Sequence, residues 1–345
     1  MPRGLAYVGS RTTRERNARG CGISVCEVGE SGAWRLIQQV TGLRNPSYLC
    51  LHPALPLLYA VHGDFSEVSS FHIAGDGRIT QTGEQSTAGR NPVHLAVSPS
   101  GQWLLLANYA SGNVVSLRIG EGGALGAVAC SLPLPGACGP RAEQAGPHPH
   151  QICFDPTGRW ALVPDKGLDQ VFALGLTEST GYLHVGGATS FPAGCGPRHM
   201  VFADAGLAYV VGELDRTVMA CRYAAESGQL SISSRHATVP TNVASGSAAG
   251  ILLTPGGNTL AVSNRGHDSV ALFHRSPTGE LAPPTWVRTG RTPRFIGCGP
   301  DGDHLVVANE DDDTVATVLL GRDLPPSCTP VAHTGSPVCV IFRKS

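Results

Sequence analysis

The sequence predicts an all-β protein, a seven-bladed β-propeller, and three observations support this fold class. Glycine and proline are frequent, with 44 Gly and 26 Pro among 345 residues, which is typical of short strands joined by tight turns. One pattern recurs along the chain: a proline or small residue, an apolar run, a turn often of Pro-x-Gly type, a second apolar run and a polar residue. No helical period of apolar residues competes with this pattern.

The repeats have the length of a four-stranded propeller blade. They begin at positions 46, 92, 149, 197, 248 and 293, so the steps are 46, 57, 48, 51 and 45 residues. A blade of this kind takes roughly 40–50 residues, so six complete repeats predict six blades. The longest step contains the poorly patterned stretch Leu132 to Gly146. We expect this insertion to overhang one end of the ring, since long ordered loops are often functional.

Both ends of the chain are predicted to build the seventh blade. A partial repeat opens at Pro337 and runs to Phe342, shortly before the chain ends. The strands missing from this repeat are present near the N-terminus, at 5–8 and 22–26. Joining them in one blade closes the ring and leaves no open sheet edge. We therefore expect residues 1–345 to form one domain, which is an ordinary size for an all-β domain.

Composition and charge exclude several classes of protein. The 25 Lys and Arg nearly balance 26 Asp and Glu, which excludes a polybasic nucleic-acid binder. No apolar run approaches the roughly 20 residues of a membrane span, and the N-terminus lacks a signal-peptide pattern before the polar stretch Arg11 to Arg19. We expect a soluble, cytoplasmic protein without nucleic-acid or membrane partners; its oligomeric state stays open.

The cysteines predict neither a metal site nor disulfide bonds. All eleven are scattered, without a CxxC pair or the Cys/His spacing of a structural zinc site. Several lie inside apolar runs, so we expect them to be buried and to act as small hydrophobic residues. We expect no metal and no cofactor.

One end of the predicted ring collects charged and imidazole side chains. The first two strands of a blade are antiparallel, so the residue that opens the first and the residue that closes the second lie at the same end. Loop tips usually carry Gly, Asn, Asp and Ser, so this composition predicts a functional face around the channel mouth. The openers are Asn45, His94, His148, His150, Arg198, His199 and Arg294. The closers are His62, Asn108, Tyr109, Asp165, Glu213, Asn264, Arg265, His267, Asn309 and Glu310.

Several of these residues also have a structural interpretation. Arg198 and Glu213 belong to one blade and can form a structural ion pair. His148 lies beside a proline and can simply cap a loop. His199 directly follows Arg198, and because neighbouring side chains of a strand point in opposite directions, we expect it to pack rather than to face the channel. The acidic run at 311–313 is interpreted as a solvated turn rather than a calcium loop.

The motifs resemble those of a known family. The stretch 196–202 (GPRHMVF), followed by Glu213 and Leu214, is similar to the signature of the propeller-type bacterial 6-phosphogluconolactonases, a family that includes the fungal 3-carboxy-cis,cis-muconate lactonizing enzyme. The resemblance covers nearly the whole chain and keeps the blade order. One departure is Gly250, where many members of the family carry an acidic residue. The resemblance extends to Asn45-Pro46-Ser47, Ala107-Asn108-Tyr109, His150 six residues before Pro156, Ser263-Asn264-Arg265-Gly266 and Thr292-Pro293-Arg294.

The resemblance implies metal-free attack of a bound water on the carbonyl of a lactone. His150, or Glu213 with a raised pKa, would be the base. Arg198 and Arg265 would stabilise the oxyanion, and Arg265 or Arg294 would bind a phosphate or carboxylate of the substrate. The predicted catalytic residues are therefore His150, Arg198, Glu213 and Arg265. The predicted substrate-binding residues are Asn108, His148, Asp165, Asn264, His267, Arg294 and Asn309.

Three function classes follow from this interpretation. Hydrolysis of a sugar-type lactone is favoured, with 6-phosphogluconolactone the most common substrate of the family and with an anionic small molecule as the partner. A muconate-type lactonizing cycloisomerase is the alternative, in which the same arginines hold carboxylates. The third class, a binding platform without catalysis, should expose more aromatic hot spots than an aromatic content of 6% provides. We also expect the site residues to lie on a solvent-facing rim, so that their replacement leaves the fold intact.

Overall fold

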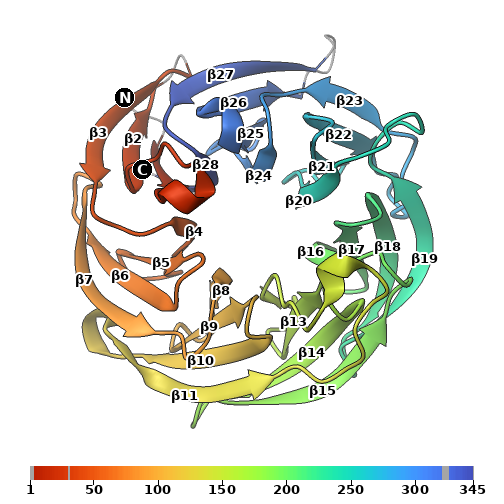
Figure 1. Ribbon diagram of the computed structural model, residues 1–345, viewed down its shortest axis with the longest axis horizontal. Helices are drawn as coiled ribbons and strands as arrows, with labels where there is room; N and C mark the ends of the chain where they lie inside the picture. Colours follow the sequence, from red (N-terminus) through yellow and green to blue (C-terminus); the bar gives the residue numbers. More distant parts are fainter. Residues whose placement is uncertain (1–3, 30–31, 321–325, 345) are drawn as a thin grey trace.

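Seven four-stranded antiparallel sheets form a ring around a central channel (Figure 1). The computed structural model describes residues 4–29, 32–320 and 326–344. Successive blades follow one another around the ring in chain order, and each blade places its first strand at the channel and its fourth at the outside. The predicted seven-bladed β-propeller is confirmed.

The strands of the seven blades have the following bounds. Blades 1 to 3 contain β4 (Pro46–Leu51), β5 (Leu57–His62), β6 (Glu67–Ile73) and β7 (Ile79–Ser86); β8 (Pro92–Val97), β9 (Trp103–Asn108), β10 (Asn113–Ile119) and β11 (Leu125–Pro133); and β12 (Cys153–Phe154), β13 (Trp160–Asp165), β14 (Gln170–Thr177) and β15 (Tyr182–Ser190). Blades 4 and 5 contain β16 (Pro197–Asp204), β17 (Leu207–Gly212), β18 (Thr217–Ala224) and β19 (Gln229–Ala237); and β20 (Ser247–Leu253), β21 (Thr259–Arg265), β22 (Ser269–His274) and β23 (Thr285–Arg288). Blade 6 contains β24 (Pro293–Cys298), β25 (His304–Asn309), β26 (Thr314–Leu319) and β27 (Ser327–His333), and blade 7 contains β28 (Pro337–Lys344), β1 (Gly4–Ser10), β2 (Ile23–Val28) and β3 (Trp34–Val40).

Blade 7 joins the two ends of the chain. The C-terminal strand β28 is its innermost strand and pairs antiparallel with β1, from Gly4 opposite Lys344 to Gly9 opposite Cys339. β1 in turn pairs with β2, and the N and C labels lie close together in Figure 1. The expected closure of the ring is confirmed.

The hydrophobic core lies between neighbouring blades. The second strands are buried along their whole length, as in β5 and β9, because blades cover both of their faces. Between blades 1 and 2, for example, Tyr59 and Val61 pack with Leu95, Leu104 and Leu106. This arrangement leaves the first strands to line the channel.

The cysteines follow the expectation only in part. No disulfide bond joins any of the eleven in the described part of the chain, and Cys26, Cys195, Cys221 and Cys339 are buried. Cys21 and Cys138, however, are exposed, because both lie in loops rather than in strands. Of the cysteines inside apolar runs, Cys221 and Cys339 are buried as expected, whereas Cys50, Cys153 and Cys298 are only partly buried.

A one-residue bulge recurs in the innermost strand. In blade 4, Pro197 is opposite Gly212 and His199 is opposite Val211, so Arg198 is an extra residue. A bulge of this kind redirects side chains. Both Arg198 and His199 line the channel as a result, and the expectation that His199 points away from it is wrong. The equivalent extra residues in blades 1, 2, 6 and 7 are Ser47, Val93, Arg294 and Val338.

The predicted insertion lies over the rim at one end of the ring, and it contributes no residue to the lining of the central cavity. It contains the short 3₁₀ helix η3 (Ala142–Gln144), which lies in front of blade 4 in Figure 1. Gly139 N donates to Gly167 O at 2.8 Å, and Gln144 Nε2 donates to Lys166 O at 2.9 Å. The insertion therefore fixes the backbone around Lys166 at the rim of the channel.

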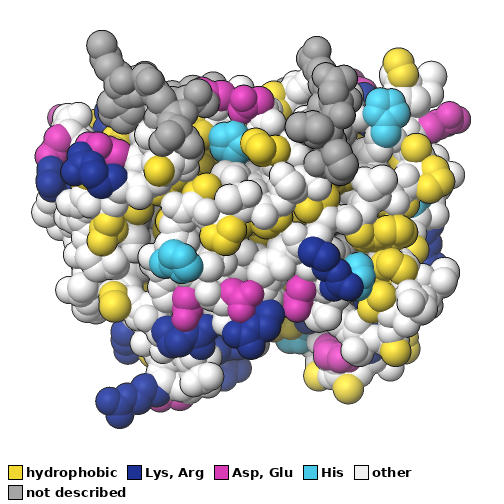
Figure 2. All heavy atoms as spheres, turned by 90° about the horizontal axis from the view of Figure 1, so that it is seen from above, with side chains coloured by type: hydrophobic (Ala, Val, Ile, Leu, Met, Phe, Trp, Pro, Cys, Tyr) yellow, Lys and Arg dark blue, Asp and Glu magenta, His cyan; other side chains and the backbone are white. Residues whose placement is uncertain are grey.

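The mouth face of blades 6 and 7 carries many ion pairs. Figure 2 shows basic and acidic side chains gathered along the lower edge of the ring. Pairs on this face include Arg19 with Asp313 at 2.5 Å and Arg291 with Asp312 at 2.6 Å. Within the described residues, no helix is long and apolar enough to cross a membrane.

Candidate active site in the central channel

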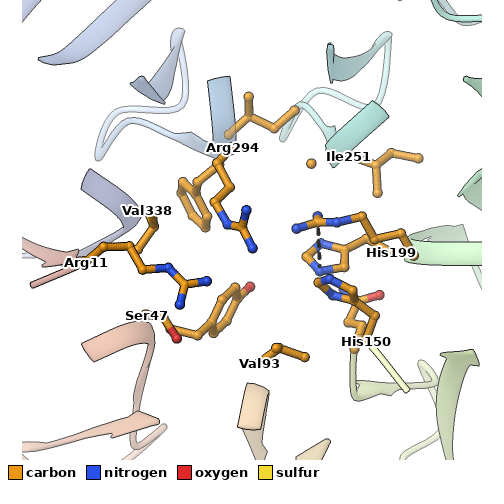
Figure 3. Close-up of a pocket in the computed structure, with 14 residues that line it drawn as sticks. Arg11, Ser47, Val93, His150, His199, Ile251, Arg294 and Val338 are labelled. Atoms are coloured by element: carbon orange, nitrogen blue, oxygen red, sulfur yellow. Dashed lines mark hydrogen bonds between the residues drawn. The ribbon is translucent and has the colours of Figure 1, made fainter. Parts of the chain in front are cut away.

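The innermost strands enclose a cavity of about 70 Å³ on the channel axis. Figure 3 shows Arg11 and Arg294 pointing into it from one side and His150 and His199 from the other. The bulge residues Ser47, Val93, Arg198, Arg294 and Val338 are all among its lining residues. Three of the eleven predicted site residues line this cavity, namely His150, Arg198 and Arg294.

A second set of equivalent positions surrounds the cavity, and we call it the rim ring. In each blade a proline or alanine near the start of the inner segment pairs with a residue near the end of the second strand, as Pro92 does with Asn108 and Ala248 with Asn264, and the rim-ring residue directly follows the second member of this pair. The rim ring consists of Gly63, Tyr109, Lys166, Glu213, Arg265, Glu310 and Arg11, for blades 1 to 7 in order. From blade 3 to blade 7 its charges alternate in sign.

Glu213 is the most strongly paired carboxylate of the site. Its Oε1 lies 2.8 Å from Lys166 Nζ, and its Oε2 lies 2.9 Å from Arg198 Nε and 3.1 Å from Arg265 Nη2. Burial raises the pKa of the Glu213 carboxyl, but the charges of Arg265, Lys166 and Arg198 outweigh burial and hold it far below its ordinary value. The structural ion pair with Arg198 is confirmed, and the expected raised pKa is wrong. Glu213 is a permanent anion that holds three cations in place.

Arg198 is a buried and fixed cation. Its side chain is 4% exposed, and its Nη1 donates to Ala249 O at 2.7 Å. Burial, together with the repulsion of Arg265 and Arg294, lowers the pKa of Arg198 to about 9, although Glu213 opposes this. Arg198 is therefore still protonated at neutral pH, and it presents a positive charge to the cavity without having to rearrange.

His150 is a buried neutral imidazole. Burial lowers its pKa well below 6.5, and the charges of Arg198, Lys166 and Arg294 add to the effect. Its Nδ1 is buried and has no hydrogen-bond partner within the described part of the chain. The His199 ring lies 5.2 Å from it, centroid to centroid. His150 thus keeps an unprotonated, unpaired nitrogen, which is the form that a general base needs.

Arg11 was missed as a candidate, and it lies on the opposite side of the cavity from His150 (Figure 3). It follows strand β1 directly, and it is 2% exposed. Its Nη1 donates to Asp64 Oδ2 at 2.9 Å, and its Nε lies 3.9 Å from Glu310 Oε1. Burial and the charge of Arg294 lower the pKa of Arg11 to about 10, so it also stays charged at neutral pH.

Lys166 was also missed as a candidate. Its position relative to the repeats could have identified it. In blade 3 the predicted closing residue was Asp165, the last residue of the second strand. One residue further in each blade lies the rim ring, which includes both Lys166 and Arg11. In blades 4, 5 and 6 the charged residue at that position was already among the closers.

Four predicted substrate-binding residues have structural roles instead. They are nearly or fully buried closers whose side chains bond to neighbouring turns and strands, so they do not line the cavity. Asp165 Oδ1, for instance, accepts hydrogen bonds from the backbone N–H groups of His148, Gly167 and Leu168. Side chains of the other three bond as follows: Asn108 Nδ2 to Thr87 O, Asn264 Nδ2 to Thr238 O, and Asn309 Nδ2 to Thr314 Oγ1.

His148 and His267 lie outside the cavity lining as well. His148 stacks on the Tyr109 ring at 4.3 Å between centroids and bonds Tyr109 O through Nδ1. His267 bonds Ser269 through Nδ1 and is half-buried. Both are side chains of the rim, and the loop-cap interpretation of His148 agrees with its contacts.

Gly250 lines the cavity and leaves no room for a side chain. A Cβ at this position would lie 2.9 Å from Ile296 Cγ1 and 3.1 Å from the Ile296 backbone nitrogen. An acidic residue here would therefore require strand β24 to shift. Because Gly250 replaces an acidic residue, the net charge of the cavity is more positive than it would be with a carboxylate at this position.

The expectation of a solvent-facing rim is wrong for the central residues. His150, Arg198 and Glu213 are 6%, 3% and 7% exposed, because the bulges and the narrow ring turn them inwards. In the described part of the chain, no group of three or more His, Cys, Asp or Glu side chains is placed to hold a metal ion. The positive charges that the site presents come from its arginines and one lysine.

Comparisons with known proteins place this geometry in context. The sequence profile of the family described as "Lactonase, 7-bladed beta-propeller" matches residues 5–342. The chain is 33% identical over 316 residues to a Bacillus subtilis protein named 6-phosphogluconolactonase, and the match covers 87% of this chain and 88% of the relative. Two solved structures are similar: a Pseudomonas aeruginosa periplasmic gluconolactonase (TM-score 0.87, 25% identity, 98% of both chains) and a Lactobacillus plantarum protein (TM-score 0.90, 27% identity, 99% of both chains).

Proposed function

This chain belongs to the seven-bladed β-propeller lactonase family, and from that premise we propose that it hydrolyses a sugar lactone, with 6-phosphogluconolactone as the substrate. The observation that carries this proposal is the pairing of two groups at one cavity. His150 offers a neutral, unbonded imidazole nitrogen, and Arg198 offers a fixed positive charge. Hydrolysis of a lactone needs both.

The proposed reaction uses His150 as the general base. A water molecule gives a proton to His150 while its oxygen attacks the lactone carbonyl. The charge that develops on the carbonyl oxygen is stabilised by Arg198, which needs no reorganisation because Glu213 already holds it. The ring C–O bond then breaks, and the proton on His150 passes to the leaving ring oxygen. The product is a single open-chain hydroxy acid.

An anionic substrate fits this base better than a neutral one. In the empty cavity, burial and, in addition, the charges of Arg198, Lys166 and Arg294 lower the pKa of His150 and make it a weak base. A bound anion offsets those charges, so the pKa of His150 rises towards the working pH when the substrate binds. The efficiency of a general base increases as its pKa approaches that pH. Binding of the anion and proton transfer are thereby coupled.

The size of the cavity agrees with a substrate that is only partly enclosed. Ligand pockets of drug-sized molecules measure about 300–1,000 Å³, whereas this cavity measures about 70 Å³. One end of a sugar lactone fits inside, and the remainder extends along the channel. We also propose a cytoplasmic location, which fits a phosphorylated sugar substrate.

A panel of lactones tests the proposal. Proton release is followed with 6-phosphoglucono-1,5-lactone, unphosphorylated glucono-1,5-lactone and a muconolactone, each corrected for spontaneous hydrolysis. We expect the phosphorylated lactone to give the highest kcat/KM. Conversion of 3-carboxy-cis,cis-muconate without acceleration of any sugar lactone would instead establish the cycloisomerase alternative.

A further inference from the structure

We propose that Arg11, Arg294 and Ser47 form a phosphate subsite on the side of the cavity opposite His150. The proposal rests on the proposed lactonase function, since it assigns the dianionic phosphate ester of the substrate to this side. The three residues come from different parts of the fold: the end of β1, the bulge of β24 and the bulge of β4. Figure 3 shows the two guanidinium groups directed at the same space.

The polar atoms on this side lack partners of their own. Arg11 Nε and Ser47 Oγ are both buried without a hydrogen-bond partner in the described part of the chain. Arg294 Nη1 lies 3.5 Å from Glu310 Oε2, which is long for a hydrogen bond. Leaving a buried donor without an acceptor is unfavourable, so unpaired donors beside one cavity indicate a ligand that accepts from them.

Gly63 shows that these donors lie close together. A Cβ built on Gly63 would lie 2.6 Å from Ser47 Oγ and 2.8 Å from Arg11 Nη1. The other six rim-ring positions carry side chains, and blade 1 carries none, which leaves room for the two donors. The missing side chain is thus a feature of this subsite rather than of the ring as a whole.

The charge balance of the site favours a dianion. Six cations and three carboxylates form the ion-pair network around the cavity, which leaves an excess of three positive charges. The cations are Arg11, Arg16, Lys166, Arg198, Arg265 and Arg294, and the carboxylates are Asp64, Glu213 and Glu310. A phosphate monoester carries about 1.5 to 2 negative charges at pH 7 and offers three acceptor oxygens. Arginine is suited to bind it with two parallel hydrogen bonds.

The two sides of the cavity therefore differ in their role: one side binds the phosphate, and the other faces the carbonyl that reacts. On the side of blades 3 to 5, Glu213 neutralises much of the charge of Arg198 and Arg265. On the side of blades 6, 7 and 1, Glu310 lies 3.9 Å from Arg11 and 3.5 Å from Arg294, so Arg294 is weakly paired, while Arg11 shares its close partner Asp64 with Arg16. The weakly paired side takes the phosphate, and the other side faces the carbonyl that reacts.

Arg11→Gln tests the subsite through two readouts. Binding of inorganic phosphate, measured by calorimetry, should weaken by at least about tenfold, as expected for loss of a charge-assisted pair of hydrogen bonds. With lactones, KM for the phosphorylated substrate should rise by a similar factor, and kcat/KM for glucono-1,5-lactone should fall by a much smaller factor. Ser47→Ala should weaken phosphate binding by about threefold, as for a neutral hydrogen bond.

Arg291→Gln is the matched control. Arg291 is an exposed arginine on the same face, paired with Asp312 and not part of the cavity lining. Its replacement removes the same charge from the mouth, so it reports any effect of the general field. Phosphate binding within about twofold of wild type is expected for this variant.

The outcomes separate the subsite from the proposed function. Unchanged phosphate binding in Arg11→Gln, or an equal loss for both lactones, would overturn the subsite even in an active lactonase. Phosphate binding that depends on Arg11 in a protein that hydrolyses no lactone would support the subsite and overturn the function. Should Arg11→Gln not fold, Arg294→Gln, whose side chain is 22% exposed, gives the phosphate-binding test, in which weaker binding is expected and unchanged binding would overturn the subsite.

Discussion

Lys166 Nζ and Glu213 Oε1 lie 2.8 Å apart and join the rims of two neighbouring blades through side chains that are 10% and 9% exposed. This contact begins a chain of charges that continues through Arg265 in the next blade. A buried ion pair is strongly destabilised when one partner is removed, because the remaining charge has no counterion. The site residues therefore contribute to the stability of the ring as well as to its chemistry.

Glu213→Gln should destabilise the protein and reduce catalysis. Three cations would then face one another without their common anion, so we expect the free energy of unfolding to fall by about 3–5 kcal/mol. Loss of a fixed oxyanion donor lowers kcat by about a hundredfold to a thousandfold, and Arg198 would lose its anchor in this variant. Denaturant unfolding and steady-state kinetics measure the two effects. Glu226→Gln, which removes a fully exposed carboxylate paired with Arg159, is the control and should change neither.

The pH profile should show no loss of activity down to pH 6. The pKa of His150 is depressed, so the imidazole is protonated only well below pH 6.5, and the base stays available above that point. Glucono-1,5-lactone is the substrate of choice, because the second ionisation of a phosphate ester, near pH 6, would otherwise overlap. The measurement is kcat/KM between pH 5 and 8. Half-maximal activity near pH 6.5 would show that His150 is not the buried neutral base.

Asp165→Ala should affect stability rather than substrate binding. It leaves three backbone N–H groups without their acceptor, which should cost at least about 3 kcal/mol in the free energy of unfolding. KM measured well below the melting temperature should stay near wild type. A raised KM with unchanged stability would restore Asp165 as a substrate-binding residue.

The same residue predicts a pH dependence of stability. Burial raises the pKa of Asp165 to about 6 from 3.8, even though three backbone N–H groups oppose it. The folded state then binds this proton more tightly than the unfolded state, so the contribution of Asp165 is greatest below pH 3.8 and declines as the pH rises through 6. Asp165→Asn should flatten that part of the stability profile, whereas a parallel profile would show that the pKa of Asp165 does not differ between the folded and unfolded states.

Chelation should leave the lactonase rate unchanged. The described residues contain no cluster of three His, Cys, Asp or Glu side chains placed for a metal ion, and Arg198 already supplies positive charge at the cavity. Activity is measured after prolonged treatment with EDTA and removal of the chelator. A rate that falls and returns on addition of a divalent ion would require a metal in the mechanism.

The repeats predicted the architecture well because the start and the end of each blade are marked in the sequence by turn residues and polar residues. A blade needs two turns and a polar terminus at fixed spacing, so the period, the number of blades and the closure through Pro337 to Phe342 could be read from the chain. Hydrophobic alternation, however, assumes regular strands. The bulges at Arg198 and Arg294 shift the register by one residue, and the hydrophobic pattern of the sequence does not predict them.

The same one-residue shift explains most of the errors in the site. Asn108 and Asp165 end their strands and bond to neighbouring turns, while the next residue in each blade reaches the rim. Arg11 was harder to foresee, because it belongs to the blade that is split between the two ends of the chain. The ion-pair network around Glu213 depends on contacts between blades that sequence spacing does not contain.

The central claim is that a lactone is hydrolysed in the channel with His150 as the base, and kcat of His150→Asn tests it most directly. Loss of a general base costs about a hundredfold to ten-thousandfold, so we predict a kcat at least about a hundredfold below wild type on the best lactone. The melting temperature should change little, because the Nδ1 atom of His150 makes no hydrogen bond in the described structure. A correctly folded His150→Asn variant with the kcat of the wild type would contradict the account.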